Sequence, residues 1–140
     1  MSGFWKAWIQ VWCWAVIGFG VFFASAAFPA TDAGVRLFYD AIFWPVDGMA
    51  SFGDPQFRLT VALIGCVTIG WGVLFLGGVS LALRGESRLW GWLTASIGVW
   101  FVTDSILSVV LGAPVNVISN TGLLVGYLIP VLATGVLKRA

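Results

Sequence analysis

The chain has 140 residues, of which 60% are hydrophobic and only 9% are charged, and its formal net charge is +1. So few charged side chains cannot cover a water-soluble globule of this size, which excludes that class of protein and requires solvation by lipid. The chain also lacks His, which excludes bis-imidazole haem, His-based zinc or copper sites and His-dependent nucleophiles within it. We therefore expect no enzyme, no metal and no cofactor in this chain alone, and no nucleic-acid partner. Contact with lipid, quinone or pigment is possible in a membrane protein, but no residue pattern in this sequence supports it.

Four apolar segments are long enough to cross a hydrocarbon core of roughly 30 Å, which takes about 20 residues of helix. They are residues 7–27, 59–83, 89–111 and 121–137. The expected fold is a single domain over residues 1–140, an all-α integral membrane four-helix bundle with the lipid bilayer as its first partner.

Basic residues are distributed unevenly between the two sides of such a bundle. One side receives Arg36 and Arg58, and the other receives Lys6, Arg84, Arg88, Lys138 and Arg139. The positive-inside rule then predicts a multi-pass protein of the bacterial inner membrane with both termini in the cytoplasm.

The first span has two interpretations. Ala24-Ser25-Ala26 follows the apolar run and has the form of a signal-peptidase site. However, the preceding region holds only Lys6, and the run is long and rich in Trp and Phe. We expect a retained membrane anchor.

The longest connection, residues 28–57, contains one helical pattern. Thr31 is placed to cap a short helix on which Asp32, Arg36 and Asp40 recur every four residues, so that opposite charges can pair. Leu37 and its apolar neighbours lie away from that stripe. This pattern predicts an amphipathic helix in the membrane interface with its polar side toward water. It serves either as a lid over the bundle or as a gate or docking surface.

The second span has a recognisable start at Asp54-Pro55. An Asp side chain can accept a hydrogen bond from the first free amides of a helix, and Pro suits the first turn because it has no N–H to lose. This pair predicts a helix boundary and no function.

Asp104 is the most informative residue, because it is an ionisable group inside the third apolar run. A charge at membrane depth costs at least a few kcal/mol on insertion scales and needs a partner, a polar cavity or a function. Helical spacing places Trp100 and Ser108 on the same face as Asp104. Asn116 and Asn120, from the following turn, are placed to close a polar pocket over it.

Two interpretations of Asp104 remain open. In the first, Asp104 pairs with an arginine from the outer side, Arg58 before Arg36, and the pair ties the helices together. In the second, its carboxylate titrates and serves a proton relay or a ligand.

Small residues indicate where helices meet, because small-xxx-small spacing lets membrane helices approach closely. The strongest instance is Gly122-x-x-x-Gly126, followed four residues later by Pro130. We expect this face to pack within the chain or, as the alternative, to form a homodimer seam. Weaker instances are Gly20-x-x-x-Ala24, Thr68-x-x-x-Gly72 and Thr94-x-x-x-Gly98.

The layout of four short spans, an aromatic-rich first external connection and the Asp54-Pro55 start resembles the DoxX-like group of small bacterial membrane proteins. Thr103-Asp104-Ser105 and Gly112-Ala113-Pro114-Val115-Asn116 are similar to segments of other small proteobacterial four-span proteins. The resemblance implies a four-helix bundle associated with redox or quinone-linked membrane systems, and it carries over no catalytic residue.

Two functional classes follow. The first is an accessory or structural subunit of a larger membrane complex, redox or energy-transducing, with other membrane subunits or further copies of the chain as partners. It is favoured by the small extramembrane mass. The second is a small transporter or ligand-binding membrane protein that uses Asp104.

Overall fold

The computed structural model describes residues 1–48 and 52–139. In chain order the elements are α1 (Gly3–Ala24), the 3-10 turn η1 (Ser25–Ala27), α2 (Ala33–Ile42), α3 (Pro55–Leu83), α4 (Leu89–Val110), α5 (Asn116–Ala133) and the 3-10 turn η2 (Val136–Arg139). Four of these helices, α1, α3, α4 and α5, are long and apolar enough to cross a membrane. The expected all-α fold of four long helices with a short helix in the first connection is confirmed.

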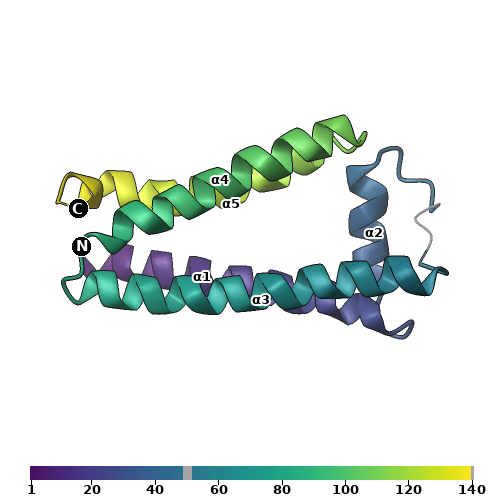
Figure 1. Ribbon diagram of the computed structural model, residues 1–140, viewed down its shortest axis with the longest axis horizontal. Helices are drawn as coiled ribbons and strands as arrows, with labels where there is room; N and C mark the ends of the chain where they lie inside the picture. Colours follow the sequence, from purple (N-terminus) through teal and green to yellow (C-terminus); the bar gives the residue numbers. More distant parts are fainter. Residues whose placement is uncertain (49–51, 140) are drawn as a thin grey trace.

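The long helices form two pairs, α1 with α3 and α4 with α5 (Figure 1). Both chain termini lie at one end of the molecule, and α2 lies across the other end (Figure 1). The two pairs lie close together near the termini and diverge toward α2 (Figure 1). This divergence decides which side chains of α4 and α5 meet the rest of the chain.

Two helix starts show how polar residues set the boundaries. Asp54 accepts a hydrogen bond from the Gln56 amide at 2.9 Å, and Pro55 is the first residue of α3, as its sequence predicts. In contrast, α5 begins at Asn116, five residues before the predicted start of the fourth span at 121. A prediction from hydropathy alone misses this first turn, because the turn is polar. Its Asn side chains form hydrogen bonds with Asp104 on α4 and therefore do not need water.

The closest helix packing is between α1 and α3. A Cβ added at Gly20 would lie 2.6 Å from the backbone nitrogen of Ile69 and 2.8 Å from the carbonyl oxygen of Gly65. A Cβ added at Gly65 would lie 2.6 Å from the carbonyl oxygen of Gly20, and it would also meet the backbone of Ala24. The weaker Gly20-x-x-x-Ala24 motif therefore brings two backbones together, and Gly72 of Thr68-x-x-x-Gly72 also approaches α1, where an added Cβ would lie 3.1 Å from the backbone nitrogen of Ile17.

The expectation for Gly122 and Gly126 is half wrong. A Cβ at Gly126 would lie 3.1 Å from the Trp12 ring, but a Cβ at Gly122 would meet nothing within 4 Å. The two helix pairs diverge toward the end at which α5 begins (Figure 1), so Gly126 meets α1 and Gly122 does not. Pro130, one turn further, is buried but supplies no N–H to the Gly126 carbonyl. That carbonyl accepts instead from the indole of Trp8 at 2.9 Å.

An aromatic core joins all four long helices at the end near the termini. The Trp12 ring lies 5.4 Å from the Phe75 ring and 5.4 Å from the Tyr127 ring, between centroids. The Tyr127 and Thr94 hydroxyls share a hydrogen bond of 2.9 Å, and the Trp12 indole donates to the Leu123 carbonyl at 2.9 Å, so both polar groups are satisfied. This end of the bundle is its structural centre.

Candidate functional site

The arginines at the α2 end are engaged with Asp32. Arg36 donates from Nε and Nη2 to the Asp32 carboxylate, both at 2.9 Å, and Arg58 pairs with its Oδ2 at 2.8 Å. Arg58 also donates to the carbonyl oxygens of Ala26 at 2.6 Å and Phe52 at 2.8 Å. Hydrogen bonding from Arg36, followed by that from Arg58, lowers the pKa of Asp32 below its ordinary value of 3.8. This cluster locks α2 to α1 and α3.

The expected pairing of Asp104 with Arg58 or Arg36 is therefore wrong. Among the described residues, Asp104 makes no ion pair. Arg58 lies at the start of α3, which packs on α1, and the loop after α1 delivers Asp32 to it. Asp104 lies on α4, in the other pair, where the two pairs have diverged (Figure 1).

The polar side of α2 is also placed differently from the prediction. Asp32 and Asp40 are buried, whereas the Leu37 side chain is exposed. Asp40 accepts from the Gly48 amide at 2.8 Å. The Thr31 hydroxyl does not cap α2 but bonds back to the Ser25 carbonyl at 2.7 Å. The carboxylates find partners inside the protein, so this helix turns Asp40 inward together with Val35, while Leu37 is turned outward.

Asp104 instead receives a set of neutral donors from α4 and α5. Its Oδ1 accepts hydrogen bonds from Ser108 Oγ at 3.1 Å, Asn116 Nδ2 at 3.0 Å and Asn120 Nδ2 at 3.1 Å. Ser105 Oγ is also reached by Asn120 Nδ2, at 3.3 Å. We call these five residues the Asp104 cluster. Three of them were expected beside Asp104, and the structure brings them there.

The orientation of the amides in the cluster is set by their other contacts. Ser119 Oγ donates a hydrogen bond to Asn116 Oδ1 at 3.0 Å. Asn116 Nδ2 also donates a hydrogen bond to Ser108 Oγ at 2.9 Å. The Asn116 oxygen is thus turned away from Asp104 and its N–H groups are turned toward it. The cluster therefore turns amide N–H groups toward Asp104 Oδ1.

The second carboxylate oxygen of Asp104 is open. Among the described residues, no group of the chain donates to Oδ2, whereas three donate to Oδ1. No buried side-chain polar atom of the described residues lacks a hydrogen-bond partner, so Oδ2 is not sealed inside the protein. The cluster therefore presents one oxygen of an uncompensated carboxylate to a molecule outside the chain.

Two aromatic side chains are related to the cluster, one by helical spacing and one by its electrostatic interaction with Asp104. Trp100, one helical turn before Asp104, has its ring 5.6 Å from that of Trp71 on α3, which turns this face of α4 toward the other helix pair. Tyr39 lies on α2, where burial and the Asp104 carboxylate both raise its pKa. Local sequence patterns do not point to Tyr39, because its effect on and from Asp104 depends on how distant segments are placed.

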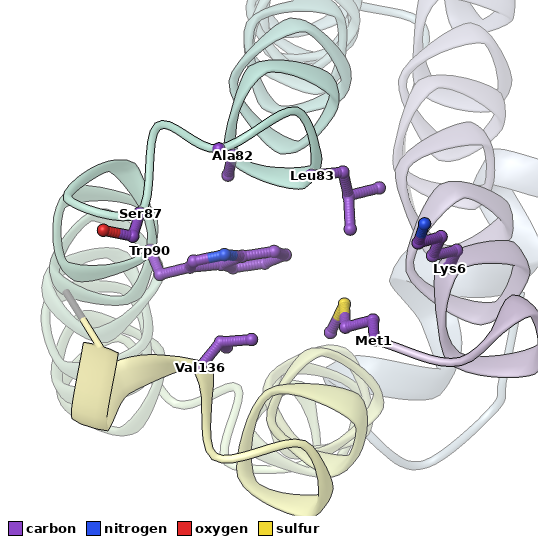
Figure 2. A pocket seen from close by; sticks show the side chains of 8 residues that line it. Met1, Lys6, Ala82, Leu83, Ser87, Trp90 and Val136 are labelled. Carbon is purple, nitrogen blue, oxygen red and sulfur yellow. The ribbon is translucent and has the colours of Figure 1, made fainter.

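A second candidate lies at the opposite end of the bundle. A pocket of about 200 Å³ there is lined by Met1, Lys6, Ala82, Leu83, Gly85, Ser87, Trp90 and Val136. Figure 2 shows Lys6 at one side of it and the Ser87 hydroxyl turned away from its centre. Within the described residues no three His, Cys, Asp or Glu side chains gather to hold a metal. The pocket lining carries one charged side chain, Lys6, whereas the other site gathers three side-chain donors on one carboxylate, so the Asp104 cluster is the stronger candidate.

Comparison with known proteins adds no name to this site. No protein-family model matches the chain, and neither a curated protein nor a solved structure matches it significantly.

Proposed function

We propose that this chain is a multi-pass membrane protein that binds a ligand at Asp104, as a small transporter or a ligand-binding protein. The observation that carries the proposal is the uncompensated carboxylate. Neutral donors fix Oδ1, Oδ2 is open, and the two nearest candidate arginines are held by Asp32. An ionisable group in a membrane span is costly, and such groups mark ligand or ion pathways.

Accessibility of Asp104 is tested at mildly acidic pH with a hydrophobic carbodiimide, which enters lipid. A protonated carboxyl group transfers its proton to a nitrogen of the reagent while its oxygen adds to the central carbon, and this forms a covalent adduct. We expect mass spectrometry of the protein in lipid vesicles to find the adduct on Asp104. Asp32 and Asp40 are matched internal controls, because one is paired with arginines and the other is buried under the Gly48 amide. An unmodified Asp104, or equal modification of all three, would contradict the proposal.

An accessory subunit is the second candidate, and one observation favours it. The apolar windows of α4 and α5 are 17% and 22% buried, against 39% for α1. The second pair therefore offers much apolar surface to lipid, to another membrane subunit or to a further copy of the chain. Purification in mild detergent separates the candidates: large co-purifying subunits support the accessory role, and an isolated chain or homo-oligomer supports the ligand-binding role.

We further propose that the termini face the cytoplasm of a bacterial inner membrane. Five of the seven Lys and Arg residues belong to the end that holds the termini. In a background without Cys13 and Cys66, an impermeant maleimide applied to intact cells should label Gln56→Cys and should label Glu86→Cys only after lysis. The reverse pattern would show the opposite orientation.

A further inference from the structure

We propose that the ligand of the Asp104 cluster is an amphiphile with a protonated amine, which enters from the bilayer and places its ammonium group against Asp104 Oδ2. This inference rests on the proposed ligand-binding function and names its substrate class. It is carried by charge, by the position of the site and by the surfaces that surround it.

Charge selects a cation. Among the described residues, Asp104 makes no ion pair, and all the hydrogen bonds that it accepts come from uncharged Ser and Asn groups. The described part of the chain therefore supplies no cation to Asp104, and a cationic ligand from outside the chain would be its first ion-pair partner. Pairing within a low-dielectric environment strengthens the attraction, and an ammonium group brings the hydrogen-bond donors that Oδ2 lacks.

The donor set selects an ammonium group over a metal ion. The nearby amide nitrogens of Asn116 and Asn120 point at Asp104, so their N–H groups face the carboxylate. Hard metal cations need several oxygen ligands, and no group of metal-binding side chains forms among the described residues. A single open carboxylate oxygen is sufficient for one ammonium group.

The position of the site favours entry from the bilayer. Asp104 lies six residues before the end of α4 at Val110, or about 9 Å along the helix axis. Leu107, three residues further along α4 and therefore a neighbour of Asp104 on the helix surface, is exposed and apolar, so the surface beside the cluster suits an alkyl chain. Trp100, one turn deeper on the same face of α4 and packed on Trp71, supplies an aromatic ring on the cluster's side of the helix, and such rings attract ammonium groups.

The experiment uses dodecylamine, dodecanol and ethylamine as probes of the purified chain in a nonionic detergent. Binding is measured by native mass spectrometry and by the shift in the thermal unfolding temperature. Because a hydrogen bond to a charged group contributes more than one to a neutral group, we expect protonated dodecylamine to bind about tenfold more tightly than dodecanol. Asp104→Asn should abolish this preference, and Asp54→Asn, which removes an exposed outer carboxylate, should retain it.

Each outcome bears on a different part of the proposal. Equal binding of dodecylamine and dodecanol by the wild type overturns the amine class; if the carbodiimide still modifies Asp104, the ligand-binding function survives. Ethylamine binding as tightly as dodecylamine overturns entry from lipid. Preference retained in Asp104→Asn, together with an unmodified Asp104, overturns both proposals. Should Asp104→Asn fail to fold, the wild-type comparison of the three probes decides.

Discussion

Replacement of Gly65 by Leu is expected to separate α1 from α3 and to cause a large loss of thermal stability. A Cβ at this position already lies too close to the backbone of α1, 2.6 Å from the Gly20 carbonyl oxygen. A backbone atom cannot rotate away as a flexible side chain can. Even Gly65→Ala is expected to cost about 1–3 kcal/mol, the usual range for an overpacked interior.

The matched control is Gly70→Leu on the same helix, where an added Cβ meets nothing within 4 Å. Thermal unfolding in mild detergent should show a large decrease for Gly65→Leu and little change for Gly70→Leu. Gly122→Leu on α5 should resemble the control, because Gly122 is also open. Equal stability of the two α3 variants would show that the backbones of α1 and α3 are not in contact.

Replacement of Arg58 by Gln is expected to destabilise the α2 end strongly. It removes one cation from the buried Asp32 carboxylate and leaves the Ala26 and Phe52 carbonyls without their guanidinium donor. Breaking such a pair is costly because the remaining charge is uncompensated. The control is Arg88→Gln, since Arg88 is exposed at the other end of the bundle. Thermal unfolding should fall far more for Arg58→Gln, and similar values would contradict the assigned cluster.

The ion pairs of Asp32 with Arg36 and Arg58 also predict a pH dependence of stability. The pKa of Asp32 is lowered in the folded protein by Arg36 and Arg58, so its stabilisation is fully present above the ordinary value of 3.8. It is lost as the pH falls through the lowered folded pKa. Acidification through this range should therefore lower the unfolding temperature of the wild type. The decrease on acidification should be smaller in Asp32→Asn, which has no carboxylate at this position.

Much of the fold follows from the sequence, because hydropathy and length determine which segments can be solvated by lipid. The four long helices and the start at Asp54-Pro55 depend on local chemistry and were predicted correctly. The partners of Asp104 were only partly predictable. Ser108 lies one turn away on the same helix, and the Asn residues follow in the next turn, so local spacing was sufficient for them.

The errors involve contacts between distant segments. The choice of Asp32 as the partner of Arg58 depends on where the loop after α1 places it, which no local pattern encodes. Likewise, Gly122 and Gly20 occur in the same kind of motif, but only Gly20 meets a second backbone. Small residues permit close approach, and the geometry of the whole bundle decides where that approach occurs.

A double-mutant cycle on Arg58 tests most directly whether the Asp104 carboxylate is uncompensated. The unfolding free energy in detergent is measured for Arg58→Gln, Asp104→Asn and Asp32→Asn, and for Arg58→Gln combined with each of the other two. The structure predicts that Arg58 and Asp104 add within about 0.3–0.5 kcal/mol, as separated sites do, and that Arg58 and Asp32 show clear coupling beyond that range. Strong coupling of Arg58 to Asp104, together with additivity of Arg58 and Asp32, would contradict the structure. It would show that Asp104 forms an ion pair with Arg58.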